Sequence, residues 1–256
     1  MKTITVHSSK GGSGKTFLVA NTGMSFASSG KKCVIIDCDV SGPSFNRIFL
    51  PEKTPEYYLN DFLLGKCSVS EIIHQTDIKA LDIIYSDPAP EIGKGLLAVD
   101  RSVHSKALKN LSSLKMALYN SNYNVCLLDT TPGLHYMSIN ALLSAKTVVL
   151  VVRPDSYSLG ATKHVLNSVY AKVKNSAMGS KQYFLLFNQV PNAPESAIHA
   201  LLTSYETELK EIFDLTCLGH VNCLCNEIGV KLVHSPLLAL DSQEFKTISS
   251  IVKQLQ

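Results

Sequence analysis

The stretch from Ser8 to Thr16, which reads Ser-Ser-Lys-Gly-Gly-Ser-Gly-Lys-Thr, constrains the fold more than any other part of the chain. It lies between an apolar run that contains Ile4 and Val6 and a helix-like run that begins near Phe17. A strand that turns through glycines into a helix N-terminus directs several backbone N–H groups at one point, where the helix dipole also favours negative charge. This pattern predicts a phosphate-binding loop.

The side chains of this loop fit nucleotide chemistry. Lys15 is expected to reach the β- and γ-phosphates of a nucleotide, and the Thr16 hydroxyl is expected to bind Mg²⁺. Ser13 and Phe17 belong to the same predicted nucleotide-binding stretch, and a second lysine, Lys10, stands at its start. Three glycines would let the backbone curl around phosphates without Cβ clashes: Gly11, Gly12 and Gly14. A glycine turn with two solvated lysines is the competing interpretation, but it ignores the flanking strand and helix.

Carboxylates follow two further apolar runs, Cys33–Asp37 and Asn124–Asp129. Open parallel sheets place ligand-binding groups at the carboxyl ends of their strands. Asp39, two residues beyond the first run, can orient a water or a metal-bound water there. Asp129 is expected to hold Mg²⁺ through water, and the N–H of Gly133 to sense a γ-phosphate. The alternative is that these acids only cap loops.

The order of the remaining elements predicts an α/β fold: a doubly wound, mostly parallel sheet of the P-loop NTPase type, Rossmann-like with three layers. Residues 1–256 are expected to form one α/β domain built around the phosphate-binding loop. Helices are predicted over 16–29, Leu59–Leu64, Val69–His74, 103–118, 158–174, 196–213 and 242–255, and strands over Leu81–Tyr85, Thr147–Val152, Tyr183–Phe187 and Leu215–Val221.

The amino-acid composition excludes few classes of protein. A formal net charge of +3 gives only weak support for nucleic acid as a partner. The chain enters its first strand at once, without a signal peptide, and no apolar run reaches the ~18 residues of a membrane span. Seven cysteines, an odd number partly inside apolar strands, suit free thiols in a reducing compartment. A cytoplasmic protein is therefore expected.

The pattern Lys10-Gly-Gly-x-Gly-Lys15-Thr16 resembles the deviant Walker A motif of the MinD, ParA and Mrp superfamily of P-loop ATPases. The resemblance implies that ATP and Mg²⁺ are the cofactors and that Lys10 crosses the interface of an ATP-dependent sandwich dimer. It also implies that Asp39 positions the attacking water and that Asn188 contacts adenine, although a turn-forming asparagine is the alternative. Lys10, Lys15 and Asp39 are thus the expected catalytic residues, and Thr16, Asp39 and Asp129 the expected metal site. Phe17 departs from the second threonine that many members carry.

Two functions follow from this resemblance. The first is a Mg²⁺-dependent ATPase that switches between monomer and dimer to position or partition cellular cargo, together with an unidentified activating protein or cargo. The second is an Mrp-like carrier that inserts a metal or iron–sulfur centre, suggested by Gly42-Pro43-Ser44 and by a group of soft ligands at Cys217, His220, Cys223 and Cys225. Alternating cysteines in a strand share one face, however, and core or pocket-lining thiols are the favoured interpretation of this group. A scaffold that binds nucleotide without turnover is a third, weaker interpretation.

The last helix presents an apolar stripe that admits two interpretations. The stripe consists of Phe245, Ile248, Ile251, Val252 and Leu255, with lysines beside it. MinD itself uses a basic amphipathic tail as a membrane anchor, but here the fold needs this helix for its own core. Core packing is therefore predicted, and a membrane partner is not expected.

Overall fold

A central sheet of eight strands, in the order β3-β4-β2-β5-β1-β6-β7-β8, organises the part of the chain that the structure describes. This computed structural model describes residues 1–89, 101–176, 180–224 and 236–255. Only the short β3 is antiparallel to its neighbour, so the predicted mostly parallel sheet is confirmed. The strands are β1 (Lys2–His7), β2 (Cys33–Cys38), β3 (His74–Gln75), β4 (Leu81–Ile84), β5 (Val125–Thr130), β6 (Thr147–Val152), β7 (Gln182–Val190) and β8 (Thr216–Asn222).

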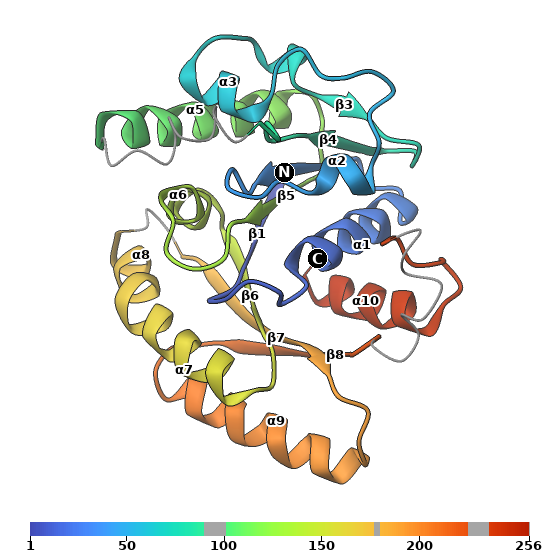
Figure 1. Ribbon diagram of the computed structural model, residues 1–256, viewed down its shortest axis with the longest axis vertical. Helices are drawn as coiled ribbons and strands as arrows, with labels where there is room; N and C mark the ends of the chain where they lie inside the picture. Colours follow the sequence, from blue (N-terminus) through green and yellow to red (C-terminus); the bar gives the residue numbers. More distant parts are fainter. Residues whose placement is uncertain (90–100, 177–179, 225–235, 256) are drawn as a thin grey trace.

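Helices cover both faces of this sheet, which confirms the doubly wound, three-layer arrangement (Figure 1). One face carries α1 (Lys15–Ser28) and α10 (Gln243–Gln254), which pack side by side, while α5, α6, α7, α8 and α9 lie on the other. The remaining bounds are α2 (Phe45–Ile48), α3 (Leu59–Leu64), the 3₁₀ turn η1 (Val69–Glu71), α5 (Arg101–Asn120), α6 (Tyr136–Ser144), α7 (Ser156–Val165), the π-helical turn η2 (Leu166–Tyr170), α8 (Ala171–Ser176) and α9 (Glu195–Lys210).

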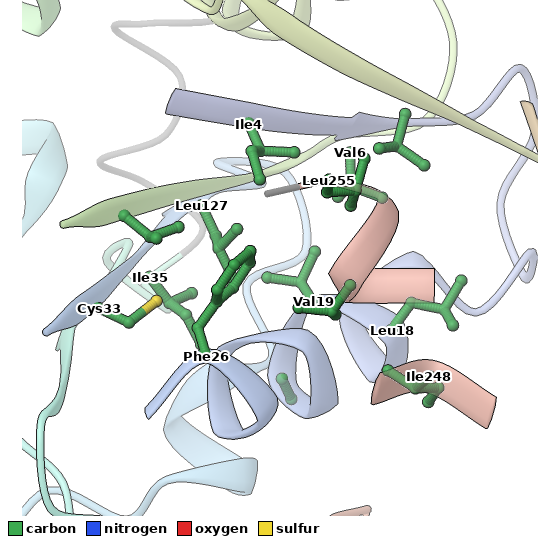
Figure 2. Close-up of a cluster of buried hydrophobic side chains, with 14 of the residues drawn as sticks. Ile4, Val6, Leu18, Val19, Phe26, Cys33, Ile35, Leu127, Ile248 and Leu255 are labelled. Carbon is green, nitrogen blue, oxygen red and sulfur yellow. The ribbon is translucent and has the colours of Figure 1, made fainter. Parts of the chain in front are cut away.

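The strands are buried on both faces because their side chains alternate between two apolar layers. In β2, Cys33 and Ile35 join the layer under α1 and α10, whereas Val34 and Ile36 join the opposite layer. Side chains of a strand alternate with a period of two, so a strand covered on both sides is apolar at nearly every position. Figure 2 shows the first layer, where Phe26 of α1 lies among the strand side chains. This burial holds the strands in fixed register beneath the loops at their carboxyl ends.

The apolar stripe of the last helix is buried in this core. Phe245, Ile248, Ile251, Val252 and Leu255 are each at most 7% exposed, and the last four pack with the layer that contains α1. The prediction that the stripe serves the core is confirmed. Among the described helices, none combines the length and the apolar character needed to cross a bilayer.

Four local features differ from the prediction. Val69–His74 is not a helix: the side chain of Glu71 accepts hydrogen bonds from Ser68 and closes a single turn, after which His74 pairs with β4. The helix α6 was not predicted. The helix predicted over 158–174 is continuous but contains the π turn η2, and β7 extends past the predicted strand end so that Asn188 lies inside it.

Removing a buried side chain from α10 tests its structural role. Ile248→Ala is expected to lower the free energy of unfolding by about 2–5 kcal/mol, because it leaves a cavity in a closely packed layer. Lys246→Ala, an exposed position on the same helix, is the matched control and is expected to change it by no more than about 0.5 kcal/mol. Urea unfolding of the two variants checks the prediction. Equal stabilities would show that α10 contributes little to the core.

Candidate functional site

Three loops converge at the carboxyl edge of the sheet because their strands are neighbours. The strands β2, β5 and β1 lie in this order, and Asp37, Asp129 and Val6 form one row across them. Asp129 lies at the carboxyl end of β5, and the loops that follow the three strands carry Asp39, the glycines and the lysines. The structure thus brings together residues that are more than 100 positions apart in the chain.

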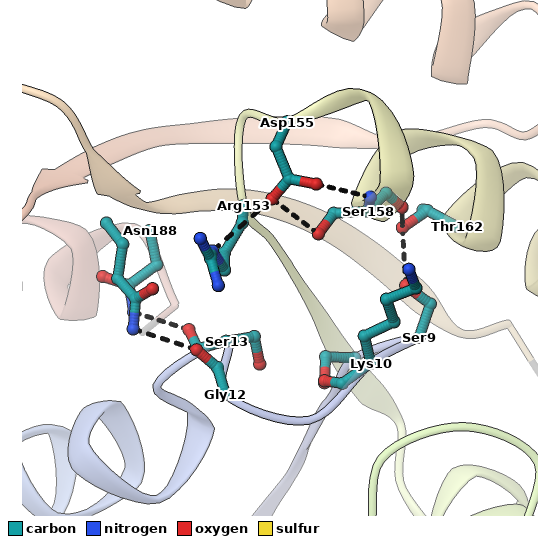
Figure 3. Close-up of polar contacts among 11 residues, drawn as sticks. Ser9, Lys10, Gly12, Ser13, Arg153, Asp155, Ser158, Thr162 and Asn188 are labelled. Atoms are coloured by element: carbon teal, nitrogen blue, oxygen red, sulfur yellow. Dashed lines mark hydrogen bonds and ion pairs between the residues drawn. The ribbon is translucent and has the colours of Figure 1, made fainter.

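The glycine loop takes its shape from contacts with β7 (Figure 3). The side-chain amide of Asn188 donates to the carbonyl oxygen of Ser13 at 2.7 Å, and that of Gln189 donates to the carbonyl oxygen of Gly12 at 3.0 Å. Gly14 caps α1 in the left-handed region, with φ 81°. A Cβ at Gly14 would lie 2.3 Å from the amide nitrogen of Asn188, so this close approach requires glycine.

Lys15, Thr16 and Asp129 meet beneath the loop. The Thr16 hydroxyl donates to Asp129 Oδ2 at 2.6 Å, whereas Asp129 Oδ1 is buried without a hydrogen-bond partner in the described residues. Burial raises the pKa of Asp129 from 3.8 to about 7, against the hydrogen bond from Thr16 and the positive charge of Lys15. Burial also lowers the pKa of Lys15, while the charges of Asp129 and Asp39 act in the opposite direction. The contacts of Asp129 therefore stabilise its negative charge only in part. Another cation or hydrogen-bond donor in the pocket would stabilise the carboxylate further.

Asp39 is held by one of its two carboxylate oxygens. Asp39 Oδ1 accepts hydrogen bonds from the Thr131 hydroxyl at 3.0 Å and from the backbone N–H groups of Ser41 at 3.2 Å and Gly42 at 3.1 Å. Asp37 supports this loop by accepting from the N–H of Asp39 at 3.0 Å. Thr131 was missed in the sequence, although its position two residues beyond Asp129 at the same sheet edge was the available signal.

This donor set fits a phosphate chain with a hard divalent cation. A hydroxyl and a carboxylate are ligands that suit Mg²⁺. Asp129 Oδ1 and Ser13 Oγ are buried polar atoms without a hydrogen-bond partner among the described residues, and a bound group would satisfy them. Lys15 is 7% exposed, at the point where the loop passes into α1. The N–H groups at the start of α1 complete an anion site of the kind found at helix N-termini.

The two lysines of the loop occupy different environments. Lys15 is buried, whereas Lys10 is exposed and its Nζ lies 5.2 Å from the ring centroid of Tyr157 at the start of α7. Beside it, the hydroxyl of Ser9 contacts that of Thr162 on α7 at 2.9 Å (Figure 3). Lys10 thus faces the outside of the molecule, and these contacts with α7 were not predicted.

Three other residues predicted to bind the nucleotide, Gly133, Asn188 and Phe17, make contacts within the protein that bear on this prediction. Gly133 lies close to the loop, but its N–H donates to the Ser8 carbonyl oxygen at 2.8 Å. Asn188 is 3% exposed and uses its amide nitrogen to hold the loop, so its contact with adenine stays a prediction. The side chain of Phe17 packs against the core. Gly11 is exposed on the loop, as a backbone cradle requires.

The soft-ligand group, of which Cys217 and His220 lie on β8 and Cys223 follows it, does not form a metal site in the described residues. No group of three or more histidine, cysteine or acidic side chains is arranged there to hold a metal ion. Cys217 has a free thiol, Cys223 is disulfide-bonded, and Cys225 lies outside the described residues. The expectation of free thiols is confirmed at Cys33, Cys38, Cys67, Cys126 and Cys217 and is wrong at Cys223.

A parallel sheet with a glycine loop after a central strand, a buried lysine and a facing carboxylate defines a P-loop protein of the nucleotide-binding class. Residues 1–180 match the family AAA_31, described as AAA domain, and the chain belongs to this family. The resemblance to the MinD and ParA group is confirmed by its relatives.

Two curated relatives and one solved structure illustrate the similarity. The sporulation initiation inhibitor protein Soj of Bacillus subtilis is 30% identical over 171 residues, which cover 66% of this chain and 64% of Soj. The septum site-determining protein MinD of Helicobacter pylori is 23% identical over 98% of this chain and 89% of its own length. MinD of Pyrococcus horikoshii, solved in complex with Mg-ADP, shares the fold with a TM-score of 0.71 at 19% identity, covering 100% and 96% of the two chains. The match with Soj thus spans less than two thirds of that relative.

The raised pKa of Asp129 predicts a pH dependence of stability. Between pH ~4 and ~7 the folded protein keeps this carboxyl protonated while the unfolded chain has lost the proton, so unfolding releases a proton and becomes easier as pH rises. Relative to Asp129→Asn, the metal-free wild type is expected to lose a few kcal/mol of unfolding free energy across this range, at up to about 1.4 kcal/mol per pH unit.

Urea unfolding at several pH values checks this expectation, with Asp214→Asn, an exposed position, as the control that should follow the wild type. Parallel curves for the wild type and Asp129→Asn would contradict the assigned shift.

Proposed function

We propose that the protein is a Mg²⁺-dependent ATPase that switches between a monomer and an ATP-bound sandwich dimer. The contact between Thr16 and Asp129 beneath the glycine loop carries this proposal, because it gathers a metal-binding hydroxyl and carboxylate beside a buried phosphate-binding lysine. Support also comes from the MinD of Pyrococcus horikoshii, which was solved with Mg-ADP on the same fold.

In this proposal the residues of the site hold ATP and Mg²⁺ by distinct contacts. The N–H groups of the loop from Gly11 to Thr16 and the Lys15 ammonium bind the phosphate oxygens. Thr16 and Asp129 hold the cation, Asp129 through water. When bound, Mg²⁺ supplies neutralisation of the charge that develops on the transferring phosphoryl group. Asn188 is proposed to present its remaining polar atom to adenine.

Hydrolysis requires an oriented water, and Asp39 is the proposed acceptor. Its Oδ1 is fixed by three donors, so the proposal assigns the water to Oδ2. A fixed carboxylate places a water in line with the phosphoryl group at little entropic cost. Catalysis would then consist of positioning and electrostatic stabilisation, without a covalent intermediate.

The proposed cellular role is spatial: the positioning or partitioning of cargo through ATP-controlled dimerisation. It is supported by relatives named as a sporulation initiation inhibitor and a septum site-determining protein. Lys10, exposed beside α7, is proposed to cross to the nucleotide of a second subunit. The metallocentre-carrier alternative is not favoured, because the relatives named above are Soj and MinD and because the described residues hold no cluster of three or more histidine, cysteine or acidic side chains suited to a metal ion.

Replacing Asp39 separates binding from turnover. Asp39→Ala is expected to bind ATP with an affinity close to that of the wild type but to lose hydrolysis by 100-fold or more, in the range of about 3 kcal/mol found for single catalytic groups. Lys15→Ala is expected to lose ATP binding itself. Equilibrium binding and phosphate release measured on the same samples check both. If Asp39→Ala hydrolysed ATP at the wild-type rate, Asp39 would not be the residue that positions the attacking water.

Replacing Lys10 tests the dimer. Light scattering in the Asp39→Ala background is expected to show a dimer with ATP and a monomer with ADP, and Lys10→Ala is expected to stay monomeric with ATP while still binding it. A charge-assisted contact contributes roughly 1.5–3 kcal/mol, and a symmetric dimer contains two of them. Lys31→Ala, an exposed lysine after α1, is the matched control. Equal masses for the Lys10 and Lys31 variants in ATP would contradict the proposal.

A further inference from the structure

His7, the last residue of β1, lies fully buried directly before the glycine loop, and the proposed function gives it no role. Both nitrogens of its ring have partners. Nε2 lies 2.8 Å from the carbonyl oxygen of Gly133, and Nδ1 lies 3.1 Å from the hydroxyl oxygen of Tyr170. The imidazole therefore bridges the loop after β5 and the π turn η2.

These partners fix the tautomer of His7. A carbonyl oxygen can only accept a hydrogen bond, so Nε2 carries the proton and donates to Gly133. Nδ1 is then the acceptor for the Tyr170 hydroxyl. Burial lowers the pKa of His7 to about 4, and the charge of Lys15 acts in the same direction, so the ring is neutral at pH 7.

Gly133 is clamped on both sides. Its N–H donates to the Ser8 carbonyl oxygen at 2.8 Å, and its carbonyl oxygen accepts from His7. Its φ of 79° lies in the left-handed region, which glycine adopts without strain. An N–H that donates to Ser8 is not available to a phosphate, so contact with a γ-phosphate requires the Pro132–Gly133 peptide to turn, next to the Gly133 carbonyl group that His7 holds.

We propose that His7 is a positioning residue that latches the loop around Gly133 in the position where the Gly133 N–H donates to Ser8, and that Tyr170 keeps the latch closed by holding the Nε2-protonated tautomer. In this proposal the latch opposes ATP but not ADP, because only ATP has a γ-phosphate to which the Gly133 N–H can donate in place of Ser8. This inference rests on the proposed ATP binding.

Tyr170 is suited to this role because its ring is held independently of its hydroxyl. It is 1% exposed, and its ring centroid lies 5.8 Å from that of Tyr183 and 5.7 Å from that of Phe213. Removing the hydroxyl therefore leaves the aromatic packing in place. Tyr183 offers a matched control in the same cluster, because its hydroxyl is buried with no hydrogen-bond partner in the described residues.

The test compares Tyr170→Phe with Tyr183→Phe by titration calorimetry with AMPPNP and with ADP. Loss of one neutral hydrogen bond from the latch is expected to raise the ratio of AMPPNP affinity to ADP affinity roughly three- to tenfold in Tyr170→Phe and to leave it unchanged in Tyr183→Phe. An unchanged or lowered ratio in Tyr170→Phe, or an equal rise in both variants, overturns the latch.

A spectroscopic measurement gives a second readout. In ¹⁵N-labelled wild type, with His7→Gln used for assignment, His7 is expected to show a protonated Nε2 whose signal moves with AMPPNP and stays in place with ADP. A proton on Nδ1, or an unmoved signal in protein that has bound AMPPNP, overturns the latch and leaves the proposed function standing. If AMPPNP does not bind at all, the proposed function fails, and the latch fails with it.

Discussion

The site depends on one buried carboxylate, that of Asp129, whose negative charge the protein stabilises only in part. Asp129 ends a central strand, where burial works against its charge, and the Thr16 hydroxyl and the ammonium of Lys15 offset only part of that cost. Complete neutralisation inside the protein would remove the reason to bind a cation. Because the protein neutralises this charge only in part, the fold is stable and the Asp129 carboxylate can still be stabilised by a cation at the carboxyl edge of the sheet.

The sheet topology gives the site around Asp129 a buried side and an exposed side. Because β1 lies between β5 and β6, its loop is bordered by the carboxylate loops on one side and by α7 on the other. Lys15 turns inward toward the acids, while Lys10 stays exposed beside Tyr157. One short stretch of chain can therefore bind a ligand and also present a charge to a second molecule.

The sequence was sufficient for features encoded within a few neighbouring residues. The glycine loop, the strand-end acids and the buried stripe of α10 follow from spacing and from the rule that ligands gather at strand ends. The sequence was not sufficient to predict hydrogen bonds between segments that are far apart in the chain. The hydrogen bond from Asn188 to Ser13 joins β7 to the loop after β1, although β6 lies between these two strands, and no local pattern encodes it. The π turn at Leu166–Tyr170 was missed for another reason: its apolar residues suit an ordinary helix equally well.

The support that β7 gives to the glycine loop has a consequence for dissecting the protein. The family match ends at residue 180, but Asn188 and Gln189, which hold the carbonyl groups of Ser13 and Gly12, lie beyond it. A fragment cut at the boundary of the match would keep the loop sequence and lose the groups that shape it. The smallest fragment that keeps these contacts therefore extends through β7, beyond the end of the family match.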